Sequence, residues 1–303
     1  MSFAYAGEIA ALITAICFSI GPTFFTLAGQ RAGAAIVNRS RLLIAALMLA
    51  VIHWFTFKTF LPLDAAPDRW LWLGLSGVVG LVIGDAFLFQ ALLLLGTRLT
   101  MLVFSISPVL AAILAWLFLN ENLTFFQITG MIVTIAGVAW VVSEKNNGNN
   151  PGEPVRSNNW KGLLAALAGA LGQAGGMILA KKGLGGDFPA ISGHIIRLST
   201  AALVIWVMAF FQGQAKTTVM TMKNKSGALR FTTLGVLFGP LVGVWFSLIA
   251  IQATSVGIAT TLMALPPIFL LPIGYFIFKE RISPRAIVGT LVALAGVAML
   301  FLI

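Results

Sequence analysis

The chain has 303 residues, of which 59% are hydrophobic and only 9% are charged, and its mean hydropathy is +0.99. Ordinary globular chains carry roughly 25% charged residues, so this composition excludes a large soluble domain. A formal net charge of +10 would favour nucleic-acid binding in a soluble protein. Here the Lys and Arg residues lie between apolar segments, where they orient membrane helices. We therefore expect a polytopic membrane protein whose surroundings are the lipid bilayer, with no nucleic-acid partner.

Ten apolar segments follow one another along the chain, and each has roughly the 20 residues that a spanning helix needs. Because lipid offers no partner for backbone N–H and C=O groups, every segment is predicted to be helical. The predicted spans are 7–28, 37–57, 70–94, 97–119, 124–142, 160–182, 190–211, 231–251, 256–278 and 284–302. A polar linker covers 143–159, and a basic loop with Lys216, Lys223, Lys225 and Arg230 joins the seventh and eighth spans. Such compositions are typical of loops.

The strongest feature of the sequence is an internal repeat. Residues 105–139 and 264–298 align at an offset of 159 residues without a gap. The matched positions include Pro108 with Pro267, Glu121 with Glu280, Gly130 with Gly289, and the run AGVA at 136 and 295. Fainter matches are Asn38 with His194 and Arg41 with Arg197 at offset 156, Gly21 with Gly176 at offset 155, and Gly80 with Gly239 and Gly84 with Gly243 at offset 159. Small residues are common in spanning helices, so single matches arise by chance, but their shared order favours a duplication.

Residues 1–142 and 160–303 are therefore predicted to be two copies of one five-span unit. Five is an odd number, so the first copy ends on the side of the membrane opposite to its start, and the second copy runs through the membrane inverted. Inverted repeats of this kind recur among secondary transporters. The predicted fold is an all-α polytopic membrane protein with ten transmembrane helices in two inverted five-helix repeats.

The doubled motif resembles the EamA family of the drug/metabolite transporter superfamily. The shared pattern is a proline in the fourth span of each unit, a glutamate just after that span, and a fifth span of small residues that ends in Gly-Val. It is carried by Pro108, Glu121 and Gly137-Val138, again by Pro267, Glu280 and Gly296-Val297, and also by Arg41-Leu42 at the start of the second span. The resemblance covers nearly the whole chain. It implies a ten-helix bundle with a central cavity that exports or exchanges small metabolites, although Gly84-Asp85 departs from the superfamily's pattern.

The substrate site of such a transporter is expected near the bilayer midplane, between the repeats. Interruptions of spanning helices release backbone groups, which are tolerated only where they line protein or a water-filled cavity. The candidate interruptions that would line the cavity are Pro22, Gly84, Pro108, Gly176, Gly243 and Pro267. They lie in spans 1, 3, 4, 6, 8 and 9, so we expect these spans around the cavity and the other four as support.

Asp85 is the only acid deep inside an apolar segment. A carboxylate at that depth costs about 2.5–3.5 kcal/mol on insertion scales, so it should face the interior of the bundle. One interpretation is a group that couples transport to a proton or binds a cation. The other is structural: the carboxylate caps the interruption at Gly84 or pairs with an arginine.

Several other polar or aromatic side chains are candidates for the site. The neutral groups on the interrupted helices could orient a substrate or hydrogen-bond between helices; they are Gln90, Ser105, Ser107, Gln173 and Gln252. Trp245, beside Gly243, could stack on a flat substrate or simply pack. Arg41, His194 and Arg197 stand at the starts of spans 2 and 7. They are candidate gate residues or anion-attracting groups, with interfacial snorkelling as the alternative.

The sequence contains neither a GxxxxGK[ST] loop nor an HExxH pair, so it indicates neither an ATP-driven pump nor an intramembrane metalloprotease. With two His and the single Cys17, a metal site is not expected and an intramolecular disulfide is excluded. No cofactor and no enzymatic activity are expected. Thr124 and Ser283, close to Glu121 and Glu280, are typical helix-start residues, so the two glutamates are expected to serve structure.

We expect a secondary transporter of small metabolites in the plasma (cell inner) membrane. It would export or exchange its substrate by alternating access, with a proton as the candidate coupling ion. The alternative is a non-transporting membrane scaffold or receptor-like protein built on the same fold. Loops opposite the termini carry most of the Lys and Arg residues, which places the termini outside, whereas the resemblance implies cytoplasmic termini. Orientation, substrate, direction of transport and oligomeric state stay open at this point.

Overall fold

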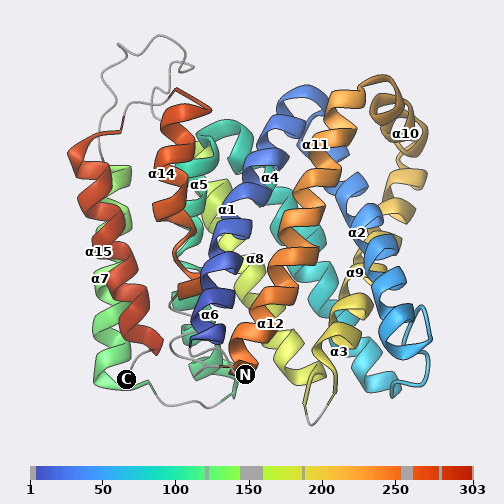
Figure 1. Cartoon of the computed structure of the whole chain (residues 1–303), viewed down its shortest axis with the longest axis horizontal. Helices are drawn as coiled ribbons and strands as arrows, with labels where there is room; N and C mark the ends of the chain where they lie inside the picture. The colour runs from blue at the N-terminus through green and yellow to red at the C-terminus, as the bar shows by residue number, and fades with distance from the viewer. Residues whose placement is uncertain are drawn as a thin grey trace.

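A computed structural model of the chain describes residues 5–119, 123–143, 160–185, 188–253, 262–279 and 282–301. Within these ranges every regular element is a helix, and the helices stand side by side in one bundle (Figure 1). Eight helical segments are long and apolar enough to cross a membrane, and two shorter apolar helices occupy Pro266–Phe276 and Pro284–Met299. This confirms the prediction of an all-helical, multi-pass membrane protein. Glu121, Glu280 and most of the predicted linker lie outside the described residues.

We call residues 5–143 the first half and residues 160–301 the second half. The first half contains α1 (Ala6–Ala32), α2 (Ala34–Phe57), α3 (Pro67–Gly77), the π-helix η1 (Val78–Gly84), α4 (Asp85–Leu95), α5 (Thr97–Phe104), α6 (Ser107–Leu119) and α7 (Phe125–Val142). The second half contains α8 (Trp160–Gly183), α9 (Ala190–Phe211), α10 (Ala215–Asn224), α11 (Ser226–Val236), the π-helix η2 (Leu237–Gly243), α12 (Val244–Ala253), α14 (Pro266–Phe276) and α15 (Pro284–Phe301). The predicted basic loop thus contains a short helix, α10. It was not predicted because its ten residues are too few and too polar for a spanning helix.

The helix bounds repeat at the offset seen in the sequence. The elements α3, η1 and α7 each begin and end 159 residues before α11, η2 and α15. Helix α9 begins 156 residues after α2. The start of α1 and the end of α15 lie at the same edge of the bundle (Figure 1). An even number of crossings produces this arrangement.

Two of the corresponding helix pairs, α7 with α15 and α2 with α9, pack against each other in antiparallel orientation. Helices α7 and α15 lie together at one end of the bundle (Figure 1). A Cβ added to Gly137 would come 2.5 Å from the backbone nitrogen of Ala293, and one added to Gly296 would meet the backbone of Thr134. Glycine therefore allows the two backbones to approach closely at both points. Helices α2 and α9 also run antiparallel, because Trp206 Nε1 donates to the carbonyl of Arg39 at 3.1 Å while His53 Nε2 lies 3.0 Å from Ser192 Oγ.

Two of the predicted helix interruptions do not occur. Helix α1 continues through Gly21 and Pro22, and α8 continues through Gly176. A Cβ on Gly21 would lie 3.3 Å from Cα of Gly239, and one on Gly176 would lie 2.9 Å from Cα of Gly80. These glycines thus serve close helix packing, and the prediction that they break their spans was wrong.

The remaining interruptions take two forms. At Gly84 and Gly243 the helix continues, but the seven residues before the junction adopt π-helical pairing. At Pro108 the chain makes a turn at residues 105–106 before α6 begins, and Pro267 is the second residue of α14. Proline is tolerated in the first turn of a helix because its missing N–H has no partner there anyway.

The predicted helix-start residues cap the fifth span of each half. Thr124 Oγ1 accepts the Gln127 amide at 3.3 Å, and Gln127 Oε1 accepts the Thr124 amide at 2.9 Å, which completes a capping box. In the second half, Ser283 Oγ accepts the Ala286 amide at 3.0 Å. The prediction that Thr124 and Ser283 start helices is confirmed.

Candidate functional site

The buried polar centre of the first half is an ion pair between Arg41 on α2 and Asp85, the first residue of α4. Only 7% of the Arg41 side chain and 9% of the Asp85 side chain are exposed. Arg41 Nε donates a hydrogen bond to Asn38 Oδ1 at 3.1 Å. The guanidinium carbon lies 5.1 Å from the ring centre of Phe89 and 5.7 Å from that of Phe25. The arginine is thus held by an acid, an amide and two aromatic rings inside an apolar cluster.

The π-helix η1 ends immediately before Asp85. A π turn holds more residues than an α turn, so it rotates the side chains that follow it, and such segments recur at functional sites. Gly84 at the end of η1 packs on α8, because a Cβ there would come 3.1 Å from the carbonyl carbon of Gly172. The structural alternative for Asp85, an ion pair with an arginine, is observed. Its part in coupling stays a prediction.

The second half carries the corresponding arginine without the acid. His194 and Arg197 lie three residues apart on α9, as Asn38 and Arg41 do on α2. His194 Nε2 and Arg197 Nε are both buried and have no hydrogen-bond partner within the residues that the structure describes. A Cβ on Gly80 would lie 3.7 Å from Arg197 Nη2 and 3.6 Å from Gln173 Oε1. The side chains of Arg197 and Gln173 therefore converge on the same glycine of η1.

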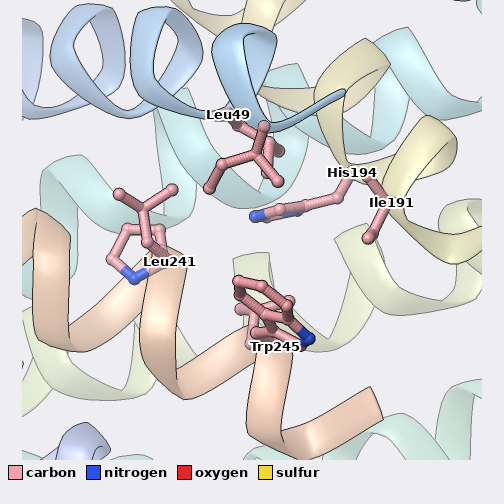
Figure 2. A pocket seen from close by; sticks show the side chains of 8 residues that line it. Leu49, Ile191, His194, Leu241 and Trp245 are labelled. Atoms are coloured by element: carbon pink, nitrogen blue, oxygen red, sulfur yellow. The ribbon is translucent and has the colours of Figure 1, made fainter. Parts of the chain in front are cut away.

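A cavity of about 20 Å³ lies between α2 of the first half and α9, η2 and α12 of the second half (Figure 2). The imidazole of His194 extends between Leu49 and Trp245, with a ring nitrogen at its tip (Figure 2). The lining residues are Leu49, Ile52, Ile191, His194, Pro240, Leu241, Val244 and Trp245. Six of these are aliphatic, so the cavity is an apolar space with one imidazole and one indole in its wall.

The predicted site residues fall into separate groups. His194 and Trp245 line the cavity next to Gly243, while Arg197 and Gln173 meet at Gly80. Asp85 is held by Arg41 and does not line this cavity.

The other predicted residues lie elsewhere. Gln90 is exposed on α4. Ser105 Oγ donates to the carbonyl of Leu102 at 2.6 Å, within its own turn. Ser107 is buried at the start of α6, and the side chain of Gln252 lies outside the described part of the chain.

Sequence reasoning missed two features of the site. The first is Asn38, whose amide fixes Arg41; the spacing of three residues on one helix was the available signal. The second is Arg39, which is buried and hydrogen-bonded to the side chains of Gln214 and Thr218, the latter at 3.2 Å. Because these partners lie 175 and 179 residues away, no local pattern reveals them.

Comparisons with known proteins agree with this architecture. Protein PecM of Dickeya dadantii (strain 3937) is 24% identical over 225 residues, which are 74% of this chain and 71% of PecM. A solved structure titled only "Crystal structure of protein" matches with a TM-score of 0.60 at 18% identity and covers 97% of this chain and 96% of its own. That likeness concerns the fold alone. The EamA-like transporter family matches residues 5–143 and 160–302. Since these two matches cover nearly the whole chain, the protein belongs to the EamA-like transporter family.

Proposed function

We propose that the protein is a secondary transporter that exports or exchanges small metabolites by alternating access. In this proposal residues 1–142 and 160–303 form two inverted five-helix repeats with ten membrane crossings, and the cavity between the halves receives the substrate. The two family matches over residues 5–143 and 160–302 support the division into repeats. The localisation that follows is the plasma (cell inner) membrane.

One observation carries the proposal. When each residue of a helix contact is replaced by its equivalent in the other half, the result is a second contact that the structure also contains. Gly137 packs on Ala293, and the equivalent positions, Gly296 and Thr134, pack on each other. A second such exchange relates the contact of Gly176 with Gly80 to that of Gly21 with Gly239. Two pairs of equivalent helices, α7 with α15 and α2 with α9, pack antiparallel. A twofold axis in the membrane plane produces this pattern, and transporters with inverted repeats have such an axis.

The size of the cavity supports a moving structure. Sites for small molecules have volumes of about 300–1,000 Å³, whereas the cavity beside His194 holds about 20 Å³. A metabolite therefore enters only if α2 separates from η2 and α12. The two sequence halves are interleaved, because α1 packs on α11, η2 and α12 of the second half and α8 packs on α3, η1 and α4 of the first half. In this proposal the two rocking bodies therefore combine helices of both halves, and their motion opens the space on alternate sides.

Asp85 is the proposed coupling group. It is a buried carboxylate paired with Arg41 and stands directly after the π-helix of the third span. Ionisable residues within spanning segments commonly mark proton or ion pathways. A proton that displaces Arg41 from the carboxylate would release α2 from α4, and this would link protonation to the movement of the halves.

Counterflow in proteoliposomes tests the proposal. Vesicles that contain the purified full-length protein are loaded with a panel of amino acids, organic acids, sugars and nucleosides, and exchange of each labelled compound is measured with and without a pH gradient. Exchange above that of protein-free vesicles is the expected result. If nothing in the panel moves under any gradient, the alternative of a non-transporting scaffold gains over transport.

The same assay tests the coupling group. Asp85→Asn removes the ionisable group, so any remaining transport should no longer respond to the pH gradient. Unchanged transport with an unchanged pH dependence would remove Asp85 from the mechanism. Exchange between two metabolites that is indifferent to pH in the unsubstituted protein would point to proton-independent exchange.

A further inference from the structure

We propose that the substrate carries an anionic group that binds at Arg197 and His194 on α9. This inference rests on the proposed transport function and adds the chemical class of the substrate: a small organic anion with an apolar body. The argument starts from a difference between the two halves at equivalent positions.

Arg41 and Arg197 are equivalent at offset 156, and Asp85 is equivalent to Val244 at offset 159. In the first half the arginine therefore has its own counter-charge, Asp85. In the second half the position of the acid is held by Val244, which lines the cavity together with His194. The acid that would neutralise Arg197 by symmetry is absent, and an apolar space lies at its place.

The charges around this point do not balance. Asp85 lies within electrostatic range of both arginines, but its ion pair is with Arg41, and Arg197 takes part in no ion pair within the described residues. Around Asp85, two guanidinium groups share one carboxylate, so one positive charge there has no counter-charge within the described residues. Arg197 is partly exposed, but its Nε is buried. A charge without a counter-charge is unfavourable inside a protein, so an anion from outside the chain is the group that satisfies it.

The hydrogen bonding of Arg197 and His194 is also incomplete. Arg197 Nε and His194 Nε2 are buried without partners within the described ranges. Arg197 does not itself line the cavity, but it lies one turn from His194 on α9 and within electrostatic range of the His194 ring. The His194 ring extends into the cavity (Figure 2). Arg197 Nε is always a donor, and His194 Nε2 is a donor in the Nε2–H tautomer. Two such donors without an acceptor in the described ranges fit a carboxylate or a phosphate group.

The rest of the cavity defines the other end of the ligand. Leu49, Leu241 and Val244 form apolar walls, and the indole of Trp245 faces the same space (Figure 2). Such walls favour an aliphatic or aromatic body and offer little to a polyhydroxylated one. The site therefore suits a ligand with one charged end and one apolar end.

Binding to the purified full-length protein tests this assignment without any transport step. The probes share an aromatic body and differ in charge: phenylacetate, phenyl phosphate, phenylacetamide and phenethylamine. Affinity is measured from the shift in melting temperature with probe concentration. Because a hydrogen bond to a charged group contributes about 1.5–3 kcal/mol, an anion should bind roughly 10- to 100-fold more tightly than the amide. The carboxylate and phosphate probes then show which anion fits.

Three variants locate the effect. Arg197→Gln should abolish the preference for the anion. Val244→Asp should also abolish it, because the new carboxylate supplies the missing counter-charge to Arg197. Val244→Asn introduces a neutral side chain of the same size as Asp, so it should keep the preference for the anion. If Arg197→Gln does not fold, the two Val244 variants still decide the question.

The proposal is overturned if no anion shifts the melting temperature, if the amide binds as tightly as the anions, or if the preference survives both Arg197→Gln and Val244→Asp. The proposed transport function fails separately. Anions that bind through Arg197 but never exchange in counterflow would leave the anion site standing and exclude transport. Exchange of neutral compounds that Arg197→Gln leaves unchanged would retain transport and exclude the anion site.

Discussion

The third and eighth spans have the same sequence of helices, but the residue that follows the π-helix is an acid in one and an apolar residue in the other. Both consist of an eleven-residue α-helix, a seven-residue π-helix and a second α-helix. In the third span the residue after the π-helix is Asp85, which is paired with Arg41 in an apolar cluster. In the eighth span it is Val244, which lines a cavity together with His194. Nε2 of His194 and Nε of Arg197, three residues further along α9, are buried without partners within the described residues. The repeat thus builds the frame, and the candidate function lies where the two copies differ.

The largest expected effect comes from breaking the pair that only the first half has. Asp85→Asn leaves Arg41 buried without a counter-charge and should destabilise the protein by about 3–5 kcal/mol. Arg41→Gln should cost a similar amount. The double variant should lose less than the sum of the two single losses, because neither charge remains. Thermal unfolding in detergent measures all three, and additive losses would show that the pair contributes no coupling energy.

A smaller effect should separate the two equivalent glycine contacts. Gly176→Ala would place a Cβ 2.9 Å from Cα of Gly80, whereas Gly21→Ala would place one 3.3 Å from Cα of Gly239. Overpacking costs about 1–3 kcal/mol, so Gly176→Ala should lower the melting temperature more than Gly21→Ala. Gly80→Ala is the matched control, since its Cβ would have no neighbour closer than 3.6 Å. The reverse order would mean that the halves are packed differently from this structure.

The smallest effect should distinguish the caps of α7 and α15. Thr124→Ala and Ser283→Ala each remove an acceptor for a first-turn amide and should cost about 1 kcal/mol. Gln127→Ala should cost a further part of this amount, because Gln127 returns a hydrogen bond to Thr124. Its counterpart, Ala286, has no side chain that can do so. Equal stability of Gln127→Ala and the unsubstituted protein, measured by thermal unfolding, would contradict the contribution of the capping box.

Much of the frame could be predicted from the sequence, because lipid forces each apolar segment to be helical and the duplication places the same residues twice. The span at 190–211 was predicted with the bounds of α9. Glycine and proline were harder to interpret. From the sequence alone, Gly21-Pro22 and Gly176 were predicted to interrupt their helices. In the structure the two glycines are positions where two helices are in contact.

The site was only partly predictable for a related reason. Asp85 and Arg41 were both singled out, yet their pairing depends on the rotation that η1 imposes and on the packing of α2 against α4. Gly84, the last residue of η1, packs closely on Gly172 of α8, and no local sequence pattern predicted the π-helix. The difference between Asp85 and Val244 was present in the sequence. Only the structure shows that Asp85 pairs with Arg41 and that Val244 lines a cavity.

The most direct test of alternating access uses the cavity wall as a reporter. The chain has a single cysteine, Cys17, which is buried, so Cys17→Ala provides a cysteine-free background. Trp245→Cys in that background then places one thiol at the cavity wall, on a residue that is 55% exposed. Leu203→Cys, at a similarly exposed position (65%) on the lipid-facing side of α9 and outside the cavity, is the matched control. A membrane-impermeant thiol reagent should label Trp245→Cys in both right-side-out and inverted vesicles and leave Leu203→Cys unlabelled. Labelling of Trp245→Cys from one side only, under every gradient and with every substrate, would contradict the account.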